Sequence, residues 1–198
     1  MAISIEDIKR LKELTGVGMT DAKQALVEVD GDFDKALESM RKKGLTKAEK
    51  KGEREARQGI VDAYLHSGRI GVLVEVNCET DFVARTDDFK NFVHDVAMHI
   101  AAAAPEYISL EDISDAEKET KVAEFTEKVK NEGKPENMVA QIVEGMIKKH
   151  FAEKCLLDQP FIKNPDQTVG DLLKEHIAKL GENMVIRQMS RIELGAVS

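Results

Sequence analysis

The chain has 198 residues, of which 42% are hydrophobic, and this allows one substantial core and a small companion domain. Its formal net charge of −8 repels a phosphate backbone at long range, so general nucleic-acid binding is disfavoured. Aromatic residues make up only 5% and Trp is absent, a composition that favours helices over a large sheet. We therefore expect an α+β protein in which helix dominates.

The two cysteines, Cys78 and Cys155, stand far apart, with no Cys-x-x-Cys pattern and no His at ligand spacing. This argues against a zinc site and gives no disulfide framework, which fits a reducing cytosol. No apolar run approaches the roughly 20 residues that span a bilayer, and the N-terminus turns acidic early. The sequence predicts a cytoplasmic protein without a metal, a cofactor or a membrane anchor.

Apolar residues at helical spacing predict three short helices within residues 1–44. The segment from Ser4 to Asp7 resembles a capping box at the start of the first helix. Gly31-Asp32 separates the second helix from the third, and Gly44 is placed as the C-terminal cap of the third. We interpret this unit as a small docking domain.

The turn Gly16-Val17-Gly18 follows the first predicted helix. No strand precedes it and no third Gly follows, and the chain has no Gly-Lys-Ser/Thr ending, so nucleotide binding by this turn is disfavoured. Two interpretations remain open. Either Val17 and Met19 are available to a partner, or Met19 packs locally.

Residues 41–57 contain eight basic and three acidic groups and no aromatic residue. This composition predicts a linker helix with a positive face, which divides the chain into residues 1–57 and a core of residues 58–198. A solvated helix is the preferred interpretation, and contact with an acidic partner is the alternative. RNA binding would require stacking aromatics, which this segment lacks.

From Ile60 the apolar period changes to two, and Ser67-Gly68 interrupts it with a turn, so a β-hairpin is predicted. A third strand is expected near the C-terminus, where four apolar residues keep one parity although Gln188 and Ser190 interrupt them. These four residues are Met184, Ile186, Ile192 and Leu194. The result is a small antiparallel sheet of three strands.

The second predicted strand leads into the segment from Val76 to Arg85, which we call the tip. Here the Asp81 carboxylate stands beside the Phe82 ring in a short turn. This pair suits a partner that offers a pocket with a polar or cationic rim. Residue chemistry alone favours a Phe82 that folds back into its own core, because most Phe residues are buried.

Thr86-Asp87-Asp88 is expected to cap a helix that ends before Pro105. The segments 115–132 and 136–157 should pair as a helical hairpin, which serves either core packing or a dimer surface. Thr168 begins a second capping-box pattern, before a helix that Gly181 ends.

No motif of an ordinary enzyme is present: no nucleophile elbow with a Ser-His-Asp order, no His-Glu-x-x-His and no recognisable carboxylate pair. His94 and His99 lie five residues apart on one predicted helix, well off a common face, so a shared metal is disfavoured. An enzyme is therefore not expected.

Three segments resemble the elongation factor Ts family: Leu14 to Lys23, Thr80 to Arg85, and Gly181 to Met184. The first also resembles the ubiquitin-associated three-helix fold. The resemblance implies a guanine-nucleotide exchange factor for elongation factor Tu, which itself binds no nucleotide. It further implies that the N-terminal domain docks on the GTPase domain, while Asp81 and Phe82 reach the magnesium and phosphate site and GDP leaves.

The resemblance assigns two sets of partner-binding residues. The exchange tip consists of Thr80, Asp81, Phe82, Val83, Ala84 and Arg85. The N-terminal docking turn consists of Val17, Gly18 and Met19. The assignment reverses the preference for a buried Phe82. Thr20 stands where the family often has a second Met, which reduces the apolar character of the docking turn.

Longer members of the family have a second, related core half, whereas this sequence has one tip and one hairpin. A second copy of the chain can supply the missing contacts, so a homodimer is expected. Two alternative functions stay open. One is an adaptor that binds helices or nascent chains through residues 1–44, and the other is an enzyme that uses the region of His94 and His99.

Overall fold

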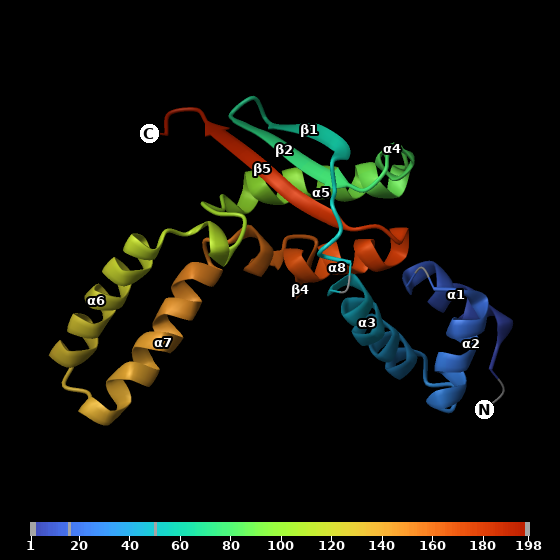
Figure 1. Ribbon diagram of the computed structural model, residues 1–198, viewed down its shortest axis with the longest axis horizontal. Coiled ribbons are helices and arrows are strands. Elements are labelled where there is room, and N and C mark those ends of the chain that lie inside the picture. Colours follow the sequence, from blue (N-terminus) through green and yellow to red (C-terminus); the bar gives the residue numbers. More distant parts are fainter. Residues whose placement is uncertain (1–2, 16, 50, 197–198) are drawn as a thin grey trace.

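The computed structural model describes residues 3–15, 17–49 and 51–196, and Figure 1 shows three parts joined side by side. The first part contains α1 (Ile5–Thr15), α2 (Met19–Glu28) and the start of α3 (Phe33–Glu49). At the start of α1 the Asp7 amide donates to Ser4 Oγ over 2.9 Å, as predicted. The three helices enclose their own apolar cluster, made by Ile8, Leu11, Ala22, Ala25, Leu26, Ala36 and Met40.

Helix α3 does not end at Gly44, so the predicted C-terminal cap is wrong. Gly44 faces α8, where an added Cβ would lie 3.4 Å from the Cβ of Ala178, and the absence of a side chain therefore permits a close helix contact. The helical part of the predicted linker is the C-terminal end of this same α3, whereas residues 51–57, which were also expected to be helical, form turns and irregular structure before β1. Ala48 of α3 is buried in the main core.

The positive charge of the segment 41–57 is partly neutralised by acids of the same chain. Lys43 lies 3.2 Å from Glu28, and Arg57 lies 2.6 Å from Glu55. Lys50 of this segment, and Gly16 of the predicted docking region, lie outside the described residues.

The main sheet has the strand order β1-β2-β5 and is antiparallel throughout. Its strands are β1 (Gln58–His66), β2 (Ile70–Cys78) and β5 (Met184–Glu193). The hairpin turn places Ser67 and Gly68 in the left-handed region, with φ of 51° and 66°. The predicted hairpin and third strand are confirmed.

Strand β5 does not keep one parity, contrary to the prediction. The register shifts between Glu75, which faces Gln188, and Val76, which faces Ile186, so β5 contains one extra residue at this point. Such a bulge reverses the alternation of side chains along the strand. Ile186 is consequently buried, whereas Ile192 is 72% exposed on the opposite face.

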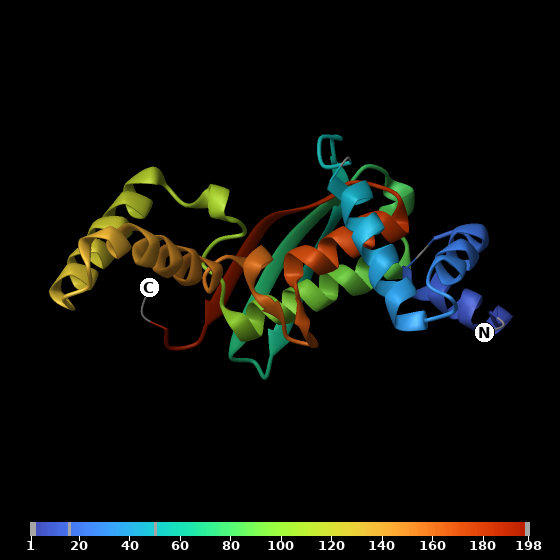
Figure 2. The same ribbon diagram turned by 90° about the horizontal axis from the view of Figure 1, so that it is seen from below.

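Two helices cover one face of the sheet, as Figure 2 shows: α5 (Asp87–Ala103) and α8 (Val169–Leu180). Both begin as predicted, because Thr86 Oγ1 accepts from the Phe89 amide and Thr168 forms a capping box with Asp171. The core between sheet and helices contains Val72, Val74, Val76, Phe89, Phe92, Val96, Val169 and Ile177. The other face of the sheet is not covered by α5 or α8.

The helical hairpin of α6 (Asp115–Asn131) and α7 (Glu136–Ala152) is confirmed, and it projects from the core (Figure 1). Four short elements lead to and from it: η1 (Leu110–Asp112), η2 (Leu156–Asp158), β3 (Pro160–Phe161) and β4 (Asn164–Thr168). The pair β3-β4 was not predicted. The protein is thus α+β, and among the described residues no helix is long and apolar enough to cross a membrane.

Candidate functional site

The tip contains a one-turn helix, α4 (Asp81–Ala84), which lies between the end of β2 and the start of α5. Thr80 is its N-cap, since Thr80 Oγ1 accepts from the Val83 amide over 3.4 Å. The Arg85 amide donates to the Asp81 carbonyl over 3.2 Å, and Thr86 then caps α5. A rigid strand and a long packed helix therefore bracket the tip.

Phe82 points away from the core and is 78% exposed. Its two apolar neighbours do the opposite, because Ala84 is buried and Val83 packs against the main cluster. The interpretation of Phe82 as a core residue is therefore wrong. One large ring is held in solvent by a turn whose other apolar side chains are anchored.

Asp81 forms an ion pair with Arg85, with 2.8 Å between Asp81 Oδ2 and Arg85 Nη2. Both side chains are exposed, and a surface pair of this type contributes only about 0.5 kcal/mol. A cation or a polar rim on a partner can therefore displace Arg85 from the carboxylate at little cost.

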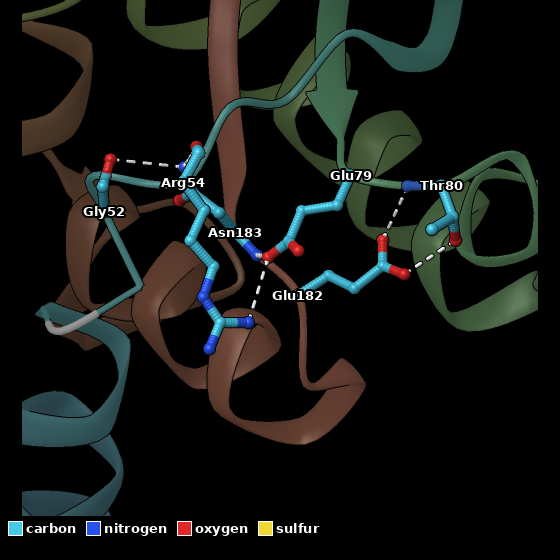
Figure 3. A network of polar contacts seen from close by, with 6 residues as sticks. All are labelled: Gly52, Arg54, Glu79, Thr80, Glu182 and Asn183. Carbon is cyan, nitrogen blue, oxygen red and sulfur yellow. Dashed lines mark hydrogen bonds and ion pairs between the residues drawn. The ribbon is translucent and has the colours of Figure 1, made fainter.

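Glu182, which precedes β5, is hydrogen-bonded to the tip (Figure 3). The Thr80 hydroxyl donates to Glu182 Oε1 over 2.6 Å, and the Thr80 amide donates to Glu182 Oε2 over 3.0 Å. Hydrogen bonds to a carboxylate are stronger than those between neutral groups. Both oxygens of one carboxylate thus hold the residue that caps α4.

A second set of contacts lies beside the first and includes Glu79 (Figure 3). Glu79 Oε1 accepts from the Asn183 amide over 2.6 Å and lies 3.5 Å from Arg54 Nη1. The side-chain amide of Asn183, which is 2% exposed, donates to the carbonyls of Arg54 over 2.6 Å and Gly52 over 3.3 Å. Sequence reasoning missed this network, although the resemblance had singled out the segment from Gly181 to Met184.

Cys78, at the end of β2, is buried and donates from its thiol to the Thr80 carbonyl over 3.1 Å. Burial raises the pKa of this thiol to about 11, helped by the negative charge of Glu182. The thiol is therefore neutral near pH 7 and has no nucleophilic character there. Its role beside the tip is packing.

The residues of the docking turn differ in their exposure to solvent. Val17 is half-buried and packs against the cluster of the three helices, Gly18 is the N-cap of α2, and Met19 is 41% exposed. Leu14, which sequence reasoning did not assign, is more exposed than Met19, and an apolar position off the buried stripe was the signal for it. Figure 1 places the start of α2 well apart from α4.

The two histidines of α5 do not meet. His94 Nδ1 lies 2.9 Å from Asp62 on β1, whereas His99 is fully buried and contacts Gln159. Among the described residues no cluster of three His, Cys, Asp or Glu side chains could hold a metal ion.

The family model described as Elongation factor TS matches residues 6–195. The chain belongs to the elongation factor Ts family. Curated relatives with the name Elongation factor Ts agree with this. The relative from Thermoanaerobacter sp. (strain X514) is 57% identical over 194 residues, which cover 98% of this chain and 95% of the relative. The relative from Carboxydothermus hydrogenoformans is 56% identical over 196 residues, covering 98% and 89%. Family membership assigns the chain to translation elongation.

Proposed function

We propose that this chain is a guanine-nucleotide exchange factor that binds elongation factor Tu with GDP and promotes GDP release. One observation supports the tip as its working part: Phe82 is 78% exposed on a turn that is anchored on both sides. Transfer of an exposed aromatic ring from water into an apolar pocket of a partner is favourable, so Phe82 can contribute to binding.

In this proposal Phe82 enters a pocket between helices of elongation factor Tu, near the magnesium and phosphate site, and Asp81 exchanges Arg85 for a polar group of the partner. Nucleotide release follows from linkage. A partner that binds the nucleotide-free state better than the GDP state must weaken GDP binding by the same factor. A buried Phe anchor that contributes about 2 kcal/mol changes this equilibrium roughly 30-fold. The chain itself makes and breaks no bond.

We further propose that residues 1–57 act as the docking part, with Val17, Gly18 and Met19 at the contact. The exposed side chains of Leu14 and Met19 support this, because they are two large apolar groups at neighbouring helix ends. The same groups also suit the adaptor alternative. In that case activity would survive the loss of the Phe82 ring.

We also propose a homodimer formed through the uncovered face of the sheet. Four large apolar side chains on this face are more than half exposed, namely Val61, Leu65, Leu73 and Ile192. They come from all three strands, and an antiparallel sheet with an apolar outer face is completed by a second sheet of the same kind. A second copy of the chain provides such a face.

The first prediction tests the exchange function by stopped-flow measurement of fluorescent GDP release from elongation factor Tu. Phe82→Ala should slow release at least tenfold, since the anchor is lost, while Asp81→Ala should slow it by a smaller factor. Leu110→Ala, on η1, is the matched control because it also removes an exposed apolar side chain. Unchanged release with both tip variants would refute the role of the tip.

A further inference from the structure

Thr80 is the residue through which the rest of the molecule acts on α4. Its hydroxyl donates a hydrogen bond to Glu182 Oε1, so a lone pair of the hydroxyl oxygen remains to accept from the Val83 amide at the start of α4. Its backbone amide donates a second hydrogen bond to Glu182 Oε2. The carboxylate therefore fixes both the rotamer and the backbone direction of the N-cap that starts the turn bearing Phe82.

Glu182 is itself held on both sides. Before it, Gly181 ends α8 in the left-handed conformation, with φ of 81°, and its amide donates to the Ile177 carbonyl. After it, the Asn183 amide donates to Glu79 Oε1. Because the backbone amides of both neighbours are hydrogen-bonded, the Glu182 side chain starts from a fixed backbone position and reaches Thr80 from there.

The same anchor reaches the segment that follows α3. The Asn183 side chain holds the carbonyls of Gly52 and Arg54, and the Arg54 guanidinium approaches Glu79. Three stretches that are far apart in sequence thus meet beside the tip, as Figure 3 shows. The segment that follows α3 is thus connected to the tip through Glu182 and Asn183, the two residues that precede β5.

We propose that Glu182 is a positioning residue for the exchange tip: its carboxylate keeps α4 in the geometry in which Phe82 meets the partner. This inference rests on the proposed exchange function. Glu182 acts through Thr80 and does not itself contact the partner. Without it the Thr80 hydroxyl is free to rotate, and the turn samples conformations in which the ring is misdirected. A preformed tip avoids the cost of ordering at the moment of binding.

The second prediction separates positioning from docking. The maximal rate of GDP release at saturating factor and the concentration for half-saturation are measured for Glu182→Ala. If the tip without Glu182 holds Phe82 in the orientation needed for exchange for about a tenth of the time, the maximal rate of GDP release falls about tenfold. The half-saturating concentration should stay within about twofold, because the three-helix unit still docks. Glu127→Ala, an exposed Glu on α6 far from the tip (Figure 1), should leave both values unchanged.

Thr80 variants provide a conservative rescue and cover the case in which Glu182→Ala fails to fold. Thr80→Ser keeps the hydroxyl that donates to Glu182 and accepts from the Val83 amide, so it should slow GDP release from elongation factor Tu less than Thr80→Val does. Thr80→Val keeps the shape of the side chain but removes the hydroxyl, and it should slow release. Equal rates for the Ser and Val variants would overturn the proposal.

A double-mutant cycle shows whether Glu182 works through the ring. In the Phe82→Ala background, Glu182→Ala should cause no further slowing, whereas multiplying effects would contradict positioning. Amide hydrogen exchange at Thr80 in the free protein should become faster in Glu182→Ala, and unchanged exchange would also overturn the proposal. If Phe82→Ala alone leaves GDP release unchanged, the proposed role of the tip in exchange fails, and the amide measurement still decides whether Glu182 orders the tip.

Discussion

At the scale of single residues, the buried polar side chains of His99, Gln159 and Asn183 all have hydrogen-bond partners. His99 on α5 is the clearest case outside the tip. Its Nε2 donates to Gln159 Oε1 over 2.9 Å, and its Nδ1 accepts from the Ile162 amide over 3.3 Å. This pairing requires the neutral imidazole, because a protonated ring has no acceptor for the Ile162 amide. His99 thereby ties α5 to the β3-β4 pair.

The third prediction follows from this pairing. Burial lowers the pKa of His99 in the folded protein, so protonation favours the unfolded chain. The contribution of His99 to stability is complete above the unfolded pKa of about 6.5 and decreases as the pH falls below it. Urea unfolding between pH 7 and pH 5 should therefore show a falling free energy of unfolding, with a smaller slope in His99→Gln.

His176 must be considered in the same experiment, because burial lowers its pKa as well. It belongs to α8, where its ring lies 4.6 Å from that of Phe92. The variant with both His99→Gln and His176→Gln should therefore have a smaller slope than either single variant. If wild type and His99→Gln have the same slope, the neutral imidazole is not what stabilises this contact.

At the scale of elements, the close approach of α8 to the segment before it requires glycine at Gly170. Gly170 lies in the first turn of α8, where an added Cβ would be 2.9 Å from the Leu157 carbonyl oxygen, whereas at Gly44 of α3 an added Cβ would be 3.4 Å from the Cβ of Ala178. Contacts with backbone atoms are less easily relieved than contacts with flexible side chains. Sequence patterns marked Gly44 as a cap, because a helix end and a close contact use the same residue type.

The fourth prediction compares two glycines in helices. Gly170→Ala should lower the free energy of unfolding by about 1–3 kcal/mol, because the new methyl group collides with the Leu157 carbonyl. Gly145→Ala in α7 meets no neighbour within 4 Å and should raise it by about 0.5–1 kcal/mol through helix propensity. Chemical denaturation of both variants measures this. Equal effects would mean that the Gly170 contact relaxes freely.

Local patterns predicted most elements, and long-range contacts explain what they missed. The three helices, the hairpin at Ser67-Gly68 and the cap at Thr168 follow from spacing and side-chain chemistry within a few residues. The parity of β5 was wrong because the bulge opposite Glu75 depends on pairing with β2. Local sequence patterns likewise could not predict the contact of Glu182 with Thr80, since the two residues are 102 positions apart in the sequence.

At the scale of the whole molecule, the three parts differ in how well their apolar surfaces are covered. The three-helix unit and the α6-α7 hairpin each contain a buried cluster of their own. The sheet is covered on one side by α5 and α8, while Leu65 and Ile192 on the other side are 76% and 72% exposed. The register places Val61 and Leu65 on the face of the sheet opposite the buried one. The sheet thus has an uncovered apolar face to which all three strands contribute.

The fifth prediction uses this face. Light scattering at micromolar concentration should give twice the mass of one chain, because two copies bury their apolar faces against each other. Leu65→Glu should give the mass of one chain, since a dimer would then bury a charge without a partner. The folded monomer should tolerate the change, because an exposed substitution usually alters stability by no more than about 0.5 kcal/mol.

Leu110→Glu is the matched control, since it adds the same charge at an exposed Leu on η1, which is not part of the sheet. It should leave the dimer intact. A wild-type mass of one chain at these concentrations would exclude this dimer. If Leu65→Glu is monomeric and also slows GDP release, the second copy supplies contacts to the partner, as expected for a chain with one core half. If Leu65→Glu is monomeric and promotes GDP release from elongation factor Tu at the wild-type rate, one copy of the tip and one three-helix unit are sufficient for exchange.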